Sequence, residues 1–305
     1  MRTLITGATG FLGRRLVASL LGDGQNVVVA SRDPARAAHR LGESVRAFGW
    51  DYRHEPFPAA ALEGVSLVYH LMGENIAAGR WTRRKKQELR GSRIESTRKL
   101  VAALPSSVTD FLCASAIGIY PGDSHQPFDE GSQLESPTSF MTQLCTDWEA
   151  AAAEAETPAR RRVSMRIGLV LGEAGMLAAL VPLYRLGLGG PLADGRQQLP
   201  WIHVDDVVAM LRFVAAHREL SGPVNLVGPE PISLGELSRS LAAVLKRPHF
   251  LRIPGLAVRA VLGEASAMVL SSYNVLPSKL LESGFEYRYR SHEPALESVI
   301  RDSYS

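Results

Sequence analysis

The chain has 305 residues, of which 46% are hydrophobic and 21% are charged, and its formal net charge is +3. This composition is typical of a globular protein with a sizeable buried core, in one large or two modest domains. The mild charge excludes the strongly basic class of proteins that bind nucleic acid, and we expect no nucleic acid partner.

The sequence also limits the compartment and the metal chemistry. Its two cysteines are too few for a disulfide framework, and the histidines show no metal-ligand spacing, so we expect no metal site. No apolar run reaches the roughly 18 residues of a membrane span, and strand-like sequence begins at once, so we expect no signal peptide. These features predict a cytoplasmic protein with no membrane partner.

The first thirty-three residues predict a strand, a glycine-rich turn, a helix and a second strand. Residues 2–6 and 27–32 are rich in β-forming side chains, and an amphipathic segment joins them. Here Gly7 and Gly10 allow a tight turn that approaches a pyrophosphate, while Gly13 lets the helix pack close to the strand. Free N–H groups at the helix start face the anion. The predicted dinucleotide contacts are Gly7, Thr9, Gly10, Phe11, Leu12 and Gly13.

The residues after the second strand indicate which dinucleotide binds. An acidic side chain there would hydrogen-bond the ribose 2′-OH of NAD, whereas Ser31 and Arg32 suit the 2′-phosphate of NADP. Asp33 follows directly and complicates this assignment. Because Pro34 comes next, we interpret Asp33 as a turn residue or helix N-cap. NADP is therefore predicted in preference to NAD.

Strand and helix patterns alternate along the rest of the chain, which predicts an α/β protein with a Rossmann-type, doubly wound parallel sheet. In the first half, strands are expected at residues 45–49, 66–72, 109–115 and 162–171, and helices at 83–104 and 139–156. In the second half, strands are expected at 201–204 and 224–227, and helices at 176–186, 205–217, 233–245, 255–270 and 277–283. Residues 287–290 alternate aromatic and basic side chains, which favours an edge strand over a nucleic acid contact.

The order of these elements also predicts how the chain divides. Residues 1–171 are expected to form an NADP-binding Rossmann domain that elements around 201–228 complete. After Gly172 the sequence becomes rich in glycine and leucine. Residues 172–200 and 229–305 are therefore expected to form a smaller, C-terminal substrate-side lobe, interleaved with the last elements of the sheet.

Several rare strings occur in a characteristic order along the chain. They are residues 73–77 (GENIA), Trp81, 92–94 (SRI), 148–149 (WE), 186–191 (LGLGGP), 195–197 (GRQ), 201–205 (WIHVD), 224–225 (VN) and 229–231 (PEP). On these strings the whole chain resembles the extended, atypical short-chain dehydrogenases/reductases. Within them it is most similar to the NAD-dependent epimerase/dehydratase-like subgroup of epimerase family proteins, loosely described as nucleoside-diphosphate-sugar epimerases.

This resemblance implies further cofactor contacts beyond the glycine turn. They are Leu71, Met72 and Gly73 at the end of the fourth strand, Asp51 and Tyr52 near adenine, Glu88 and Arg93 on the next helix, and Val170 near the nicotinamide. The alternative to a cofactor contact is a purely structural position. Leu71, Met72 and Val170 would then belong to the strand core, and Glu88 and Arg93 to a solvated helix face.

One chemical feature of the wider superfamily is missing. Its members use a Tyr-x-x-x-Lys pair to transfer a proton and hold the ribose, and a Ser or Thr after the fifth strand to bind the substrate oxygen. Here Phe140 and Leu144 occupy the positions of the pair, and Ala116 occupies that of the hydroxyl. Ser115 and Tyr120 are the substitute catalytic candidates. For Tyr120 the alternative is an aromatic that packs in a turn.

Five further residues are candidates on the substrate side: Glu74, Asn75, Arg196, Gln197 and His203. The first two follow the fourth strand, where the alternative is a turn with helix capping. The arginine and glutamine could clamp a phosphate or carboxylate, or belong to a surface loop. The histidine could carry a proton, or form a joint where a strand enters a helix, with Asp205 as N-cap.

Two interpretations of the function remain open. In one, the protein is an NADP-dependent oxidoreductase or epimerase that acts on an unidentified small molecule. In the other, it is a non-catalytic protein that binds NADP for its fold or as a redox sensor. The sequence predicts neither the substrate nor the oligomeric state.

Overall fold

A seven-stranded parallel sheet forms the centre of the computed structural model, which describes residues 2–123, 126–157 and 160–304. Its strands are β1 (Arg2–Thr6), β2 (Asn26–Ser31), β3 (Arg46–Gly49), β4 (Val65–His70), β5 (Asp110–Ala116), β6 (Arg161–Ile167) and β10 (Gly222–Leu226). They lie in the order β10-β6-β5-β4-β1-β2-β3, so the direction of winding reverses between β1 and β4. At such a point the carboxyl ends of the strands leave a crevice for a ligand.

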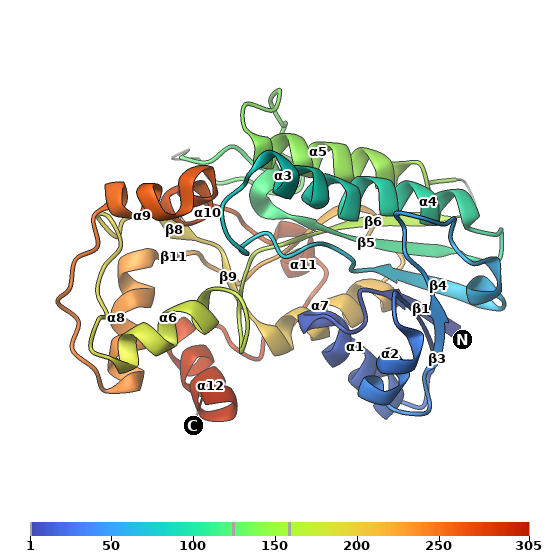
Figure 1. Ribbon diagram of the computed structural model, residues 1–305, viewed down its shortest axis with the longest axis horizontal. Coiled ribbons are helices and arrows are strands. Elements are labelled where there is room, and N and C mark those ends of the chain that lie inside the picture. Colours follow the sequence, from blue (N-terminus) through green and yellow to red (C-terminus); the bar gives the residue numbers. More distant parts are fainter. Residues whose placement is uncertain (1, 124–125, 158–159, 305) are drawn as a thin grey trace.

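Helices cover both faces of this sheet (Figure 1). One layer holds α3 (Arg83–Arg90), α4 (Ser96–Ala103) and α5 (Phe140–Ala153), and the other holds α1 (Phe11–Gly22), α2 (Pro34–Leu41) and α7 (Val204–Ala216). Because both faces are covered, the central strands β4 and β5 are buried along almost their whole length. The predicted α/β class with a doubly wound parallel sheet is confirmed.

The second half of the chain adds a group of helices beyond the carboxyl ends of the strands (Figure 1). They are α6 (Met176–Arg185), α8 (Leu234–Leu245), α9 (Gly255–Leu262), α10 (Ala267–Leu270) and α12 (His292–Tyr304), whereas α11 (Ser278–Glu282) packs against the edge strand β10. Two small sheets join them, one of β8 (Gln198–Leu199) with β11 (Ile232–Ser233), the other of β7 (Leu169–Leu171) with β9 (Trp201–His203). Side chains of α6, α8 and α12 share a buried apolar cluster. The domain boundaries at 171, 200 and 229 stay a prediction.

The predicted strand over residues 162–171 is wrong in its extent. It breaks at Gly168, so that β6 remains in the large sheet while β7 pairs with β9. A Cβ on Gly168 would lie 2.3 Å from the carbonyl oxygen of Pro200. Only glycine allows two backbones to cross so closely, and the crossing redirects the chain toward the second group of helices.

Two predicted helices are interrupted. The helix over residues 83–104 contains a five-residue π-helical turn, Gly91–Glu95, between α3 and α4. Wider turns of this kind are frequent at functional sites. The helix over 255–270 ends at Leu262, because Gly263 takes a φ of 61° before a short 3-10 turn leads into α10.

The predicted edge strand over residues 287–290 is also wrong. The carboxylate of Asp206 accepts the backbone N–H groups of Arg288 and Tyr289 at 2.8 and 3.0 Å, which hold this segment as an irregular loop. The alternating side chains of this segment could not predict its contact with Asp206, because Asp206 is distant in the sequence. The following helix α12 was not predicted, although Leu296 and Ile300 have helical spacing.

Arg161 fastens the end of α7 to the amino-terminal edge of the sheet. Its guanidinium donates to the carbonyls of Val214, His217 and Leu220 at 3.0, 2.8 and 2.9 Å. Its Nε donates to the carboxylate of Asp110 at 2.7 Å, and both of these side chains are less than 10% exposed. One side chain thus satisfies the carbonyls that a helix end leaves without partners.

We predict that Arg161→Met lowers the free energy of unfolding by about 3 kcal/mol, because it leaves a buried carboxylate and several carbonyls without this partner. Arg218 binds the same carboxylate at 2.9 Å, but its side chain is 62% exposed. Arg218→Met is therefore the matched control and should cost less than about 1 kcal/mol. Urea unfolding measures both, and equal losses would contradict the role given to Arg161.

Candidate functional site

The glycine turn between β1 and α1 lies at the carboxyl edge where the winding reverses. Gly7 has a φ of 69°, and a Cβ there would lie 2.6 Å from the carbonyl oxygen of Leu71 at the end of β4. A Cβ on Gly13 would lie 2.2 Å from the carbonyl oxygen of Gly7. Gly10 begins the helix with no side-chain cap, so the first N–H groups of α1 are open to an anion. The turn fits a pyrophosphate.

The residues after β2 lie beside this turn. The register pairs Thr6 with Ala30, so Ser31 and Arg32 come next to Gly7 at the same edge. The carboxylate of Asp33 accepts the backbone N–H of Arg36 at 2.9 Å and caps α2. The interpretation of Asp33 as a helix N-cap is therefore confirmed, and its carboxylate is already engaged.

A cavity of about 500 Å³ extends from the glycine turn into the group of helices beyond the sheet. Eleven of the residues predicted from the sequence line it, namely Gly7, Gly10, Phe11, Leu12, Gly13, Leu71, Gly73, Glu74, Asn75, Arg93 and Ser115. Its wall also includes residues that sequence reasoning missed, among them Met141, Cys145 and Trp148 of α5, Met176, Met268, Val269 and Tyr273. The three on α5 share one helix face, and that spacing could have indicated them. The others are brought in by distant segments.

Arg93 is the cation in the wall of this cavity. It lies in the π-helical turn, and its guanidinium stacks 5.2 Å from the ring centre of Trp148 and donates to the carbonyl of Glu74 at 3.1 Å. Burial lowers the pKa of the guanidinium. Among the described residues no carboxylate forms an ion pair with it. A guanidinium held so by carbonyls and an aromatic ring is ready to bind an anion or a hydroxyl oxygen.

The other expected cofactor residues lie outside the cavity wall. Glu88 is on the exposed face of α3, where it pairs with Arg84 at 3.0 Å. Asp51 forms an ion pair with Arg53 at 2.5 Å, and this hydrogen bond lowers the pKa of the carboxyl to about 2. Residues near the rim or in the strands also belong to this set: Thr9 in the turn, Ser31, Arg32, Tyr52, Met72, and Val170 in β7. Their contacts with a cofactor stay predictions.

The two catalytic candidates belong to one chain of hydrogen bonds. Ser115 donates to the carboxylate of Glu149 at 2.6 Å, and that carboxylate binds Arg166 at 2.8 and 2.9 Å. Arg166 in turn donates to the hydroxyl of Tyr120 at 2.8 Å, and this hydroxyl donates to Asn225 at 2.9 Å. Tyr120 is fully buried and does not line the cavity, and burial raises its pKa. We therefore give Tyr120 no step in the proposed chemistry.

The substrate-side candidates do not gather in one place. Glu74 and Asn75 line the cavity, but the first pairs with Lys85 at 2.7 Å and the second accepts the N–H of Ala77 at 3.0 Å. Arg196 is exposed, while Gln197 is buried and its carbonyl accepts the N–H of the first residue of α8 at 2.8 Å.

His203 lies at the joint between β9 and α7. Its Nδ1 accepts the backbone N–H of Asp205 at 3.1 Å, so the histidine itself is the N-cap that had been expected of Asp205. Its side chain is buried and lies against Tyr289, with the two ring centres 4.0 Å apart. Neither residue lines the cavity.

The positions of the missing catalytic pair lie on α5 beside the cavity. Phe140 packs edge-on against Trp81 with ring centres 5.4 Å apart, and Leu144 is buried in the cavity wall. Neither side chain can transfer a proton. The described residues contain no group of three or more histidines, cysteines and acids that could hold a metal ion, and none of their helices is long and apolar enough to cross a membrane.

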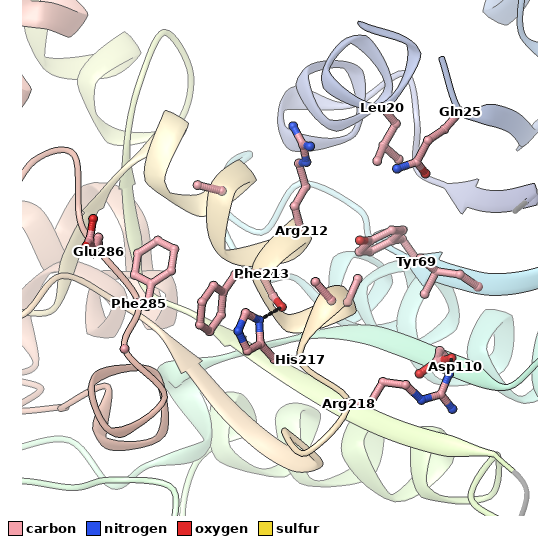
Figure 2. Close-up of a pocket in the computed structure, with 15 residues that line it drawn as sticks. Leu20, Gln25, Tyr69, Asp110, Arg212, Phe213, His217, Arg218, Phe285 and Glu286 are labelled. Carbon is pink, nitrogen blue, oxygen red and sulfur yellow. Dashed lines mark hydrogen bonds and ion pairs between the residues drawn. The ribbon is translucent and has the colours of Figure 1, made fainter. Parts of the chain in front are cut away.

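A larger cavity, of about 780 Å³, lies at the opposite edge of the sheet against α7 (Figure 2). Three of its charged residues are already paired, since Arg218 binds Asp110 at 2.9 Å and Arg212 binds Asp23 and Ser19. In Figure 2, Phe213 and Phe285 lie side by side on one flank of this cavity. None of the predicted site residues lines it, so the glycine-turn cavity is the candidate site.

Comparison with known proteins places the chain among epimerase-like proteins. Residues 3–228 match the model of the NAD dependent epimerase/dehydratase family, and residues 253–299 match a domain of unknown function (DUF1731). A chloroplastic homolog of epimerase family protein SDR39U1 from Arabidopsis thaliana is 34% identical, over 99% of this chain and 87% of that one. Epimerase family protein YfhF of Bacillus subtilis is 32% identical over 99% of both chains.

Solved structures agree with this placement. Human epimerase family protein SDR39U1, determined with NADPH, has a TM-score of 0.86 and 29% identity, and the match covers 99% of this chain and all of that one. A nucleoside-diphosphate sugar epimerase from Corynebacterium glutamicum has a TM-score of 0.78 and 26% identity, over 98% of this chain and 58% of that one.

We predict that His203 makes stability depend on pH. Burial lowers the pKa of its imidazole to about 4, against an ordinary value near 6.5, and the Nδ1 that accepts the cap hydrogen bond carries no proton. The free energy of unfolding should be greatest above pH 6.5 and fall as the pH drops toward 4, at up to about 1.4 kcal/mol per unit. His203→Asn keeps a capping side chain without this titration. Urea unfolding at pH 7 and 5 should show a smaller difference in the variant, and an unchanged difference would contradict this cause.

Proposed function

We propose that this protein, which belongs to the NAD dependent epimerase/dehydratase family, binds NADPH in the glycine-turn cavity and works as an oxidoreductase on a small molecule. The choice of NADPH over NADH rests on two adjacent residues after β2, Arg32 and Asp33. Asp33 is engaged as the cap of α2, whereas the exposed Arg32 has no ion pair among the described residues. A free guanidinium suits a 2′-phosphate, whereas the carboxylate of Asp33 is oriented toward the start of α2 by its cap hydrogen bond. The NADPH in the human SDR39U1 structure supports this choice.

The remaining contacts follow from the shape of the site. The free N–H groups at the start of α1 would hold the pyrophosphate, because Gly7 and Gly13 place no side chain there. Arg93 would bind a phosphate or ribose oxygen from the cavity wall. Asp51 and Tyr52 would contact the adenine end, and the inner cavity would receive the nicotinamide end.

NADPH, when bound, supplies a hydride for the reduction of a carbonyl group. The chain contributes a cleft beside the bound cofactor, whose wall combines the sheet edge with α5, α6, α8 and α10. Space for a small molecule next to the cofactor favours an oxidoreductase, and a cytoplasmic location stays a prediction.

The alternative is a protein that holds NADP without turnover. Phe140 and Leu144 favour it, because neither can supply the proton that the usual Tyr-Lys pair supplies. The two functions share the cofactor site and differ only in the use made of the inner half of the cavity.

We predict that Arg32→Ala weakens NADPH binding about 10- to 100-fold, since it removes a charged contact to the 2′-phosphate, and leaves NADH binding nearly unchanged. Fluorescence titration of the reduced cofactors measures both. Arg40→Ala, an exposed substitution at the far end of α2, should change neither. Equal affinities of the unaltered protein for NADPH and NADH would overturn the cofactor choice.

A further inference from the structure

The inner half of the cavity is mainly apolar. Apart from the glycine turn and the β4 loop, most of its wall is apolar, and includes Met141, Leu144, Trp148, Met176, Leu234 and Met268. Cys145 also lies in this wall. Burial raises the pKa of the Cys145 thiol to about 12, so that side chain is neutral. Such a surface favours a ligand that leaves apolar area in contact with it.

Charged ligands have little to bind there. Arg93 is the one cation among the described residues of the wall, and it lies at the cofactor side, against Gly73 and the carbonyl of Glu74. A nucleoside-diphosphate sugar carries a second diphosphate, which needs cations or free N–H groups of its own. The wall therefore disfavours a sugar nucleotide as the substrate.

Two hydroxyl side chains line the cavity in the part of the chain that is described. Ser115 is committed, since it donates to Glu149 at 2.6 Å. The side chain of Tyr273 is half-buried, and no other described residue forms a hydrogen bond with its hydroxyl. This hydroxyl is therefore free to bind a ligand in the cavity.

Two backbone hydrogen bonds hold the segment around Tyr273 in place and so position its ring. The N–H of Tyr273 donates to Gln198 at 2.9 Å, and the carbonyl of the preceding Ser272 accepts from Asp123 at 2.8 Å. Its ring belongs to the apolar cluster that contains Met141 and Cys145 of α5. These two residues follow the positions that Phe140 and Leu144 occupy, so the phenol approaches the stretch of α5 where the usual proton donor is missing.

We propose that the inner cavity accepts a compact apolar carbonyl compound, and that Tyr273 donates the proton to its oxygen. This inference rests on the proposed function. The phenol comes from the C-terminal part of the chain and shares an apolar cluster with Cys145 of α5.

The proton balance of the step is simple. The carbonyl carbon gains the hydride of NADPH, the oxygen gains the phenolic proton, and the alcohol and NADP⁺ leave. The phenolate of Tyr273 then takes a proton from water. Burial, with Cys145 and Asp123 nearby, raises the pKa of Tyr273 to about 12, so the phenol keeps its proton at neutral pH. An alkoxide is a stronger base than a phenolate, and the transfer therefore runs toward the alcohol.

The test uses 4-nitrobenzaldehyde as the carbonyl probe and UDP-glucose as the polar probe, with the full chain. Calorimetry with the NADP⁺-loaded protein should show that the aldehyde binds and that UDP-glucose binds more weakly. Tyr273→Phe should raise the Kd of the aldehyde about 5-fold, lower kcat for its reduction at least about 100-fold, and leave the Kd of NADPH unchanged. Tyr304 lies outside the cavity, and its hydroxyl has no hydrogen-bond partner among the described residues. Tyr304→Phe is therefore the control, and it should leave the aldehyde Kd, the kcat and the NADPH Kd unchanged.

The outcomes separate this inference from the function beneath it. If NADPH fails to bind, the proposed function is overturned and this inference with it. If NADPH binds but the aldehyde does not, or UDP-glucose binds more tightly, the substrate class is wrong. If Tyr273→Phe retains the aldehyde Kd and kcat of the unaltered protein, Tyr273 is not the proton donor.

Discussion

The site depends on how closely the start of α1 approaches the ends of β1 and β4. A single methyl on Gly7 or Gly13 would lie 2.6 or 2.2 Å from a backbone oxygen, so any other residue would push the helix away from the sheet. That approach places the open N–H groups of α1 at the point where the winding reverses. The crossing at Gly168 applies the same constraint to the other side of the cavity, where it sends β7 away from the large sheet and toward β9. Backbone contacts of this kind set the shape of the cavity before any side chain contributes.

Much of this arrangement was predictable from the sequence, because local patterns govern it. The tight glycine turn, the apolar runs of β4 and β5, and the Asp33-Pro34 helix start act over a few residues, and the structure confirms these elements. The cofactor contacts of the glycine turn stay predictions. The wrong predictions concern segments whose conformation depends on a residue far away in the sequence. Pro200 breaks the strand at Gly168, and Asp206 holds residues 288–289 out of a sheet. Tyr120 is drawn into a network with Arg166 and Asn225 that no spacing in the sequence reveals. Distant partners also place Tyr273 in the cavity. The segment that carries it forms backbone hydrogen bonds with Asp123 and Gln198.

The two halves of the cavity differ in chemistry. The outer half is backbone, glycine and arginine, which suits phosphates; the inner half is methionine, leucine and tryptophan, with one uncommitted phenol among the described residues. In this division the absence of the Tyr-Lys pair from α5 does not remove proton transfer from the site. It moves the donor from α5 to a segment that packs beside this helix and belongs to the part of the chain matching the domain of unknown function.

The most direct measurement is a crystal structure of the protein with NADPH bound. The account predicts that the pyrophosphate lies on the N–H groups at the start of α1 and that Arg32 contacts the 2′-phosphate. It also predicts that the nicotinamide enters the inner cavity on the side faced by Tyr273. A cofactor bound in the cavity beside Phe213, or one whose nicotinamide points out of the inner cavity, would contradict it.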